Sequence, residues 1–581
     1  MGFTPDLHLP SGTAQFAGVC APGLARGLPS GILVAPIGST KVTGDPFPTR
    51  ANSPGTISQL QSAGKQVRDK RAFFRAEGGG ALCLRELRNR LQRDLAVQLR
   101  PLPDLSTVEP YVANNDPAGF LANYAYQAGT SYGGAFQRVS APEARLALNY
   151  AAAGGPGAHA CALSVLSRGT PVNQGTAFSP VYVFRYRYTI DGSAMDGAAV
   201  RQVNLQGSFS VQVQQDNFAR YALFTNQQRN AAGSLVWFTN RTNFSGPVHT
   251  NGQFNFALNP SGSFTGLVTS VSQTAKYYNS GSSIDLNADR NGDRDVPTFA
   301  AGFERGVPAI PMPSMTVAQR QAEAALGLSL GSGVPILPDG VHLGTSGTSM
   351  TGGIYIKGNA ALAMSAGANS AIYTITQGGT TATVTVNYQT NHTQIRVGTG
   401  PTTTYNGLPN GMIFTDGGLS SLSGTVQRDS QVTVAATGDI QITNHLAYES
   451  YTPGAGGNPP SAGGASNVLG ILSWNGNVRI GTMAPNDINV HATVMTPTGE
   501  FTVDNYNVGA PRGTATILGG VIENTYGAFG TFGSQNTGYG RNFVYDTRMA
   551  SGIAPPFFPT IGTVVGILSG VNDRPNWQQT L

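Results

Sequence analysis

The sharpest chemical motif in the sequence is an acidic loop in which carboxylate and amide side chains alternate. It offers six oxygen donors, Asp285, Asn287, Asp289, Asn291, Asp293 and Asp295. Alternating oxygen ligands with Gly292 at the turn match the first half of a calcium-binding loop. With Asn287 at position 1, however, Thr298 stands at position 12, where an EF-hand would have a bidentate Glu. We therefore predict a structural Ca²⁺ loop. The alternative is a polar surface turn in which Arg290 and Arg294 offset the carboxylates.

Other residue types that do chemistry form no recognisable catalytic set. The seven histidines show no HExxH or HxH spacing, which argues against a zinc hydrolase. The chain has no Walker-type loop, and its glycine-rich pieces are not placed between a strand and a helix as phosphate loops require. A polysaccharide-cleaving β-protein would need paired carboxylates or a basic residue on one face. The candidates are scattered along the chain: Asp416, Asp439, Arg479, Asp487 and Glu500. We expect no enzyme activity and no catalytic or cofactor-binding residues.

The number and spacing of the cysteines predict no set of disulfide bonds. Cys20, Cys83 and Cys161 are odd in number, widely spaced and without a CxxC pair. This pattern predicts neither a disulfide framework nor a zinc site. We expect all three side chains to be buried or unpaired.

Composition and charge favour a protein exposed outside the cytoplasm. Charged residues make up 11% of the 581 residues, against a usual quarter, and glycine reaches 76. The net charge of +5 is local, because residues 65–100 hold ten Lys and Arg against four Asp and Glu. Positive charge confined to one segment, rather than spread over a β-surface, argues against nucleic-acid binding.

That basic segment is also the one convincing long helix, over 56–100. Its apolar side chains recur on one side while Arg and Gln fill the other. The run 78–80 is Gly-Gly-Gly, which we expect to kink or divide the helix, since each helical Gly costs about 1 kcal/mol relative to Ala. A basic amphipathic helix fits a membrane-surface contact, a partner helix, or packing on its own domain with a solvated basic face.

The rest of the chain predicts strands separated by glycine corners. Residues 246–256 and 474–480 each place a short β-prone run on either side of a corner, at Gly252 and Gly476. Residues 181–188 and 203–213 alternate as half-buried antiparallel strands do. We predict a mainly β fold: a β-solenoid, parallel β-helix-like, or a large β-sandwich, with one long N-terminal amphipathic helix.

The expected organisation has five parts. They are a low-complexity leader at 1–55, the basic helix at 56–100, a transition and antiparallel region at 101–240, a solenoid-like body at 241–530 with insertions at 280–345 and 371–406, and an aromatic, Gly- and Pro-rich tail at 531–581.

Scattered motifs between residues 60 and 570 resemble a family. Residues 61–77, with the pattern Arg-Ala-Phe-Phe-Arg-Ala-Glu, and 84–88 resemble the distal N-terminal helix of pilus-assembly proteins of the PilX type. Residues 246–252, 519–530, 538–546 and 555–559 resemble bacterial envelope proteins with a DUF4900-type region behind a pilin-like N-terminus. The resemblance implies a cell-envelope location and a role in pilus assembly.

The N-terminal residues depart from that family. Pilin-like proteins carry about 20 apolar residues there to span the membrane. Here residues 1–55 are rich in Pro, Gly, Ser and Thr, and their longest apolar piece, 31–36, is too short for a span or a signal peptide. We expect a frameshift or misplaced start at this end rather than a cytosolic homologue.

Together these patterns predict a structural or adhesive envelope protein of a type IV pilus-like or surface assembly. The expected partners are other envelope or pilus proteins, a further copy of the chain, or a surface glycan, and no nucleic acid. The alternative is a polysaccharide-binding or polysaccharide-cleaving β-helix protein. A glycan-binding strip would use five aromatic residues: Tyr448, Tyr451, Tyr526, Tyr539 and Phe543.

Overall fold

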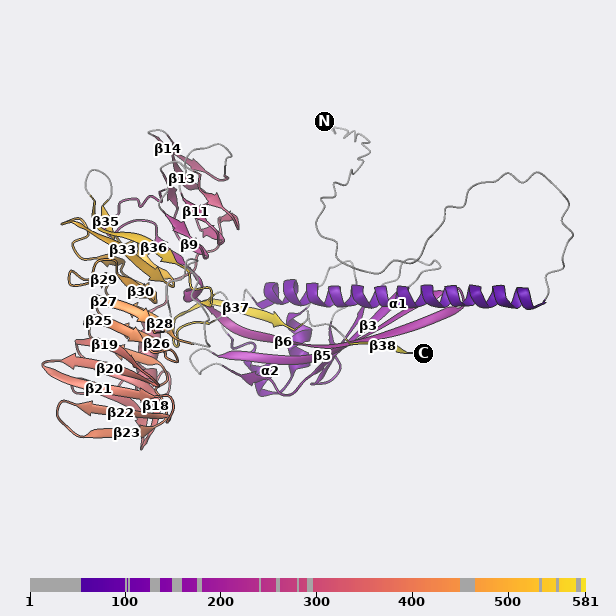
Figure 1. The fold of residues 1–581 in the computed structure, drawn as a ribbon, viewed down its shortest axis with the longest axis horizontal. Coiled ribbons are helices and arrows are strands. Elements are labelled where there is room, and N and C mark those ends of the chain that lie inside the picture. The colour runs from indigo at the N-terminus through magenta and orange to yellow at the C-terminus, as the bar shows by residue number, and fades with distance from the viewer. Residues whose placement is uncertain are drawn as a thin grey trace, which may run out of the picture. The chain divides into compact units, whose positions relative to one another are not determined.

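The computed structural model describes most of the chain from residue 54 onward (Figure 1). The described residues are 54–99, 102, 105–125, 136–148, 159–174, 180–239, 242–257, 262–279, 282–289, 296–449, 466–531, 536–549, 553–570 and 576–580. Most of them lie in strands, and one long helix stands at their N-terminal end, so the predicted fold class is confirmed.

The first part of the fold is an antiparallel sheet in the order β1-β2-β3-β5-β6-β37, with β4 beside β5 and β38 beside β6. Its strands are β1 (Gln137–Arg138), β2 (Glu143–Leu148), β3 (His159–Ser167), β4 (Val172–Asn173), β5 (Val181–Asp196), β6 (Ala199–Asn217), β37 (Thr560–Ser569) and β38 (Asn576–Thr580). The sheet therefore joins strands from both ends of the described chain. Thr560 pairs directly with Asn217, so residues 218–559 form an insertion between two neighbouring strands.

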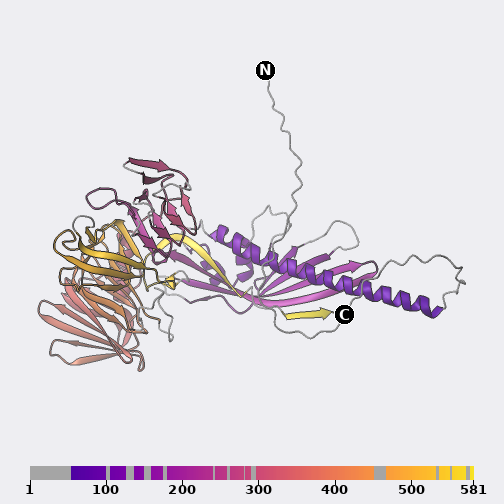
Figure 2. The ribbon, with the colours of Figure 1, turned by 45° about the horizontal axis from the view of Figure 1, so that its top comes forward.

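Helix α1 (Pro54–Leu99) packs on one face of this sheet through its C-terminal half, as Figures 1 and 2 show. The expected break at 78–80 is wrong, because the helix runs through these glycines without interruption. Close contact with the sheet explains why. A Cβ at Gly80 would lie 2.7 Å from the Leu205 side chain, and one at Gly192 would lie 2.6 Å from the Ala76 carbonyl oxygen. The glycines thus let helix and strand approach more closely than side chains would allow.

Two short helices, α2 (Glu109–Ala113) and α3 (Pro117–Tyr124), complete the cover of that face. Asp116 caps α3 by accepting a hydrogen bond from the Gly119 N–H at 2.9 Å. Phe120 of α3 stacks on Phe184 of β5 with ring centroids 4.1 Å apart. The sheet face and its helices therefore share one apolar core.

The inserted residues form a body whose first ladder contains only parallel pairs. Its strands, in spatial order, are β18 (Ser349–Lys357), β24 (Met412–Thr415), β26 (Gln431–Ala436), β28 (Val468–Ser473), β31 (Thr493–Thr496), β34 (Val521–Thr525), β7 (Leu223–Gln227), β9 (Val248–Thr250), β12 (Val268–Ser270) and β16 (Phe303–Arg305). One column of this ladder is aliphatic and buried from Ile354 to Val268, so a continuous apolar row on one face of the sheet lies in the core.

A second parallel ladder packs against the first across a common core. It begins with β19 (Ala360–Gly367), β25 (Leu419–Val426) and β27 (Ile440–Tyr448), then continues as β29 (Val478–Ile480) with β32 (Phe501–Val503), and as β30 (Asn489–His491) with β33 (Pro511–Leu518) and β36 (Thr537–Val544). Two facing sheets fit a sandwich-like body. The solenoid form of the expectation stays a prediction, which the parallel register favours.

The first ladder does not follow the order of the chain. β34 pairs with β7, although the two strands are about 300 residues apart in the sequence. From β7 the chain builds β9, β12 and β16, then passes through helix α4 (Met315–Ala325) and β17 (Gly340–Ser346) to β18 at the other end of the ladder. From β18 it returns strand by strand to β34. The β34–β7 pair, which we call the seam, thus joins two groups of strands. One group runs from β7 to β16, and the other runs from β18 to β34, later in the sequence.

Smaller sheets complete the body. An antiparallel meander continues from β19 through β20 (Ser370–Gln377), β21 (Thr380–Asn387), β22 (His392–Val397) and β23 (Thr402–Asn406). The remaining strands are β8 (Asn243–Phe244), β10 (Asn255–Phe256), β11 (Ser263–Phe264), β13 (Ala275–Asn279), β14 (Ser282–Leu286), β15 (Thr298–Phe299) and β35 (Gly530–Thr531). β13 and β14 form an antiparallel hairpin whose second strand leads into the acidic loop.

Candidate functional site

The described part of the acidic loop is held by ion pairs. Asp285 lies 3.1 Å from the Lys276 ammonium across the β13–β14 hairpin, and it accepts a hydrogen bond from Gln253 at 3.0 Å. Asp289 lies 2.5 Å from the Arg305 guanidinium. Asn287 is described and exposed, whereas Asn291, Asp293 and Asp295 lie outside the described residues.

Arg305 is the centre of this arrangement. Its side chain, 8% exposed, lies over the Phe303 ring and donates to the Tyr277 hydroxyl at 2.8 Å. Burial raises the pKa of Tyr277, while the nearby Arg305 charge lowers it. One loop carboxylate is therefore neutralised by a cation from the last strand of the first ladder. Among the described residues no group of three metal-ligating side chains gathers. Calcium binding by this loop stays a prediction.

The expectation that no cysteines pair is wrong for two of the three residues, although both are buried as expected. Cys83 of α1 and Cys161 of β3 form a disulfide with Cα atoms 6.4 Å apart. An odd count and wide spacing hid this pair, because it depends on α1 crossing the sheet above β3. Cys20 lies outside the described residues. Disulfides persist in oxidising compartments, so the bond fits a location outside the cytoplasm.

Of the five scattered polar candidates, Asp439, Arg479 and Glu500 lie near one another, while Asp416 and Asp487 have other partners. Asp416 pairs with Lys357, and Asp439 lies 3.1 Å from Arg479. Asp487 accepts a hydrogen bond from the Thr514 N–H at 2.8 Å. Burial raises the pKa of Glu500. The contacts of Asp416, Asp439 and Asp487 connect neighbouring strands of the body, which is a structural use of polar side chains.

Three residues of the expected aromatic strip are core residues. Tyr448, Tyr526 and Tyr539 are at most 3% exposed, so they cannot form an exposed strip. Tyr539 donates its hydroxyl to the Pro485 carbonyl oxygen at 2.7 Å. Phe543 is partly buried against the same core, and Tyr451 lies outside the described residues. The alternation of apolar and polar residues cannot show whether both faces of a strand are covered by the fold. For this reason the sequence suggested that these rings were exposed and free to bind a glycan.

Sequence reasoning missed two buried titratable groups inside the body. Glu523 of β34 is 2% exposed and accepts hydrogen bonds from the N–H groups of Phe501 at 2.9 Å and Gly527 at 3.2 Å. Burial raises its pKa to about 8. His491 of β30 is 3% exposed, and burial lowers its pKa to about 4. No local pattern marks either residue, since their burial comes from neighbouring turns of the ladders.

Helix α1 keeps apolar side chains exposed before and beside the stretch that covers the sheet, which begins with the buried Ala72 and Ala76. Val67 is 48% exposed and Phe74 is 65% exposed, one heptad apart on the same side of the helix. Further along, Leu87, Leu91 and Leu95 are buried in the core with the sheet. No helix among the described residues has the length and apolar character of a membrane span.

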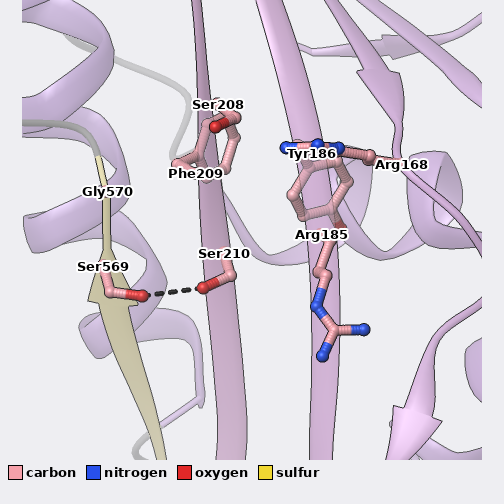
Figure 3. A pocket seen from close by; sticks show the side chains of 8 residues that line it. All are labelled: Arg168, Arg185, Tyr186, Ser208, Phe209, Ser210, Ser569 and Gly570. Atoms are coloured by element: carbon pink, nitrogen blue, oxygen red, sulfur yellow. Dashed lines mark hydrogen bonds between the residues drawn. The ribbon is translucent and has the colours of Figure 1, made fainter. Parts of the chain in front are cut away.

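The sheet face opposite α1 carries a hollow lined by arginine and serine side chains (Figure 3). Arg168 and Arg185 lie on one side of it, and Ser210 and Ser569 lie on the other with their hydroxyl oxygens 2.7 Å apart. Side chains alternate between the faces of a strand, so Arg185 points away from the core that holds Tyr186. Among the described residues neither guanidinium is paired with a carboxylate. The hollow therefore presents unneutralised positive charge.

One family model matches part of the chain. A family model described as a domain of unknown function, DUF4900, matches residues 182–272. These residues include β5 and β6 of the sheet and the first strands of the body, so the match crosses the point where the insertion begins. No curated protein matches the chain.

Among solved structures, the chain is similar to the competence-associated pilin ComZ from Thermus thermophilus. The identity is 12%, the match covers 88% of this chain and 98% of that chain, and the TM-score is 0.30.

Proposed function

We propose that this protein is a structural component of a type IV pilus-like or surface assembly in the cell envelope. The observation that carries the proposal is the exposed apolar side of α1. From Ala72 onward one side of the helix is buried on the antiparallel sheet, while Val67 and Phe74 stay exposed. Exposed apolar side chains on a helix offer a surface to a partner helix.

Three further features support the same role. Residues 61–77 of α1 have the sequence pattern that resembles PilX-type proteins. The Cys83–Cys161 disulfide fits an oxidising location. Finally, the inserted body leaves and re-enters the sheet at neighbouring positions, so the helix and sheet can serve as an anchor while the body extends from it. The PilX-type assignment is part of this proposal.

A photo-crosslinking experiment in the native organism tests the proposal. A photoreactive amino acid in place of Phe74 should crosslink the chain to pilin-like subunits in sheared surface filaments. The matched control is the same amino acid in place of Val508, which is 67% exposed on the inserted body. Equal crosslinking from both positions, or no filament subunit in the products from position 74, would overturn the proposal.

A further inference from the structure

Strand β37 forms a long edge of the antiparallel sheet, and it carries no charged side chain that would discourage a further strand from pairing with it. β37 contains no charged residue and no proline. Its register with β6 is regular from Val564 to Ser569, and among the described residues no strand pairs with its other edge. The opposite edge of the sheet ends at β1, which is only two residues long. Sheet edges are usually kept short or protected by Lys or Pro, because unpaired N–H and C=O groups accept a further strand.

The arginine-lined hollow is continuous with this edge. Ser569 of β37 stands opposite Ser210 of β6, which stands opposite Arg185 of β5. The Arg168 N–H donates to the Arg185 carbonyl oxygen at 2.7 Å, which brings a second guanidinium to the same cross-strand row. The row therefore runs from two cations through two small hydroxyl side chains to the open edge.

We propose that the β37 edge binds an extended acidic segment of a partner protein, which adds a strand to the sheet and places its glutamate side chains on the sheet face that carries Arg168 and Arg185. The added strand would lie about 14 Å from β5, three strand spacings away. Arg168 lies beyond β5, on the side of β3. The two guanidinium groups therefore attract the glutamates through the positive charge of the hollow, without direct ion pairs. Main-chain hydrogen bonds supply affinity, and the arginines select acidic segments.

Charge decides between this partner and a second copy of the chain. A second copy would bring its own β37, which offers no carboxylate, and it would leave both arginines unpaired. An acidic strand pairs with the open backbone groups and brings opposite charge to the face that carries the two guanidinium groups. The proposal concerns the sheet face opposite α1, and it does not depend on the filament role of that helix.

Hydrogen exchange on the full chain with three synthetic probes tests the proposal. The probes are a ten-residue peptide of alternating Val and Glu, the same peptide with Lys for Glu, and the Val–Glu peptide with alternate valines replaced by Pro. We expect the Val–Glu peptide to bind and to slow exchange of the amides in 560–569. The Lys and Pro peptides should do neither, since one repels the arginines and the other lacks N–H donors.

Charge reversal separates the arginine contribution from strand addition alone. The double variant Arg168→Glu with Arg185→Glu should lose at least tenfold in affinity for the Val–Glu peptide and should gain binding of the Lys peptide. Arg396→Glu, an exposed arginine on the meander, is the matched control and should leave both affinities unchanged. Unchanged Val–Glu affinity in the double variant, or peptide binding without protection of 560–569, would overturn the proposal. Concentration-dependent dimerisation that already protects 560–569 would also overturn it, in favour of a second copy.

Discussion

Glu523 shows at the residue scale how the seam of the body depends on a buried acid. It lies on β34, one of the two strands of the seam, and it pairs in register with Thr496 of β31 and Thr225 of β7. Burial raises its pKa to about 8, although the N–H groups of Phe501 and Gly527 favour the charged form. Because the folded-state pKa lies above the ordinary value of 4.5, the stability from Glu523 is full below pH 4.5 and is lost as the pH rises through 8.

Glu523→Gln should therefore make the protein less sensitive to alkaline pH. The amide oxygen can still accept both backbone hydrogen bonds, but it carries no charge that must be buried. Each pKa unit corresponds to about 1.4 kcal/mol, so the wild-type chain should lose several kcal/mol between pH 5 and pH 9, and the variant much less. Urea denaturation at both pH values measures this difference. Glu304→Gln, on an exposed side chain, is the control, and equal pH dependence in the wild type and Glu523→Gln would contradict the prediction.

Individual residues were the least predictable part of the site. The acidic loop could be seen as a pattern, but its counter-charge could not, since Arg305 comes 16 residues after Asp289 and reaches it through the packing of the body. The same holds for Cys83 and Cys161, which are separated by 78 residues and meet only because a helix crosses a sheet. Spacing along the chain indicates chemistry within one turn or strand, and these contacts are tertiary.

At the scale of single elements, α1 shows why glycine in a helix is not always a break. Its position is fixed by close contacts with the sheet at three glycines. Gly80 and Gly192 meet where the helix crosses β5, and a Cβ at Gly566 of β37 would lie 2.8 Å from the Leu95 side chain. The intrinsic cost of about 1 kcal/mol for a helical Gly is offset by burial that the close approach permits.

Two single-methyl substitutions should change stability in opposite directions. Gly192→Ala should destabilise the helix–sheet part by about 1–3 kcal/mol, because the new Cβ meets the Ala76 carbonyl oxygen, which is backbone and cannot move aside. Gly78→Ala should stabilise it by up to about 1 kcal/mol, because nothing lies within 4 Å of that Cβ position. Thermal unfolding of the two variants measures both effects, and the same sign for both would contradict the close-approach explanation.

The elements themselves could be predicted where their period was strong. The helix over 56–100 and the alternation of 181–188 were visible because apolar residues repeat at 3.6 and at 2. The return of residues 560–569 to the first sheet was not visible. That short apolar run contains no pattern that predicts its partner strand, because pairing between distant strands depends on the whole fold.

At the scale of the whole molecule, the described residues form two separate hydrophobic cores. One core joins α1, α2 and α3 to the antiparallel sheet, and the other fills the inserted body; they share no residue. The disulfide lies in the first core alone. Two cores of this kind are expected to unfold as two cooperative units.

Reduction of the disulfide should therefore affect one unit only. We expect two calorimetric transitions. Dithiothreitol should lower the midpoint temperature of one of them by several degrees, because a disulfide that closes a loop of this length contributes about 2–4 kcal/mol to the free energy of unfolding. The double variant Cys83→Ser with Cys161→Ser should reproduce the shift without reductant. A single transition that moves as a whole under reduction would show that the two cores unfold together.

The pairing of Asn217 with Thr560 has a consequence for biosynthesis. When the ribosome has made β6, the strand that must lie beside it does not yet exist, and the entire body emerges before β37 does. The nascent chain therefore exposes the unpaired edge of β6 throughout that interval, and the antiparallel sheet can be completed only in the last moments of translation or after it. A chain cut short before residue 560 would carry a finished body on a sheet that lacks its last strands, so the complete sheet is a property of molecules that reach the C-terminal strands.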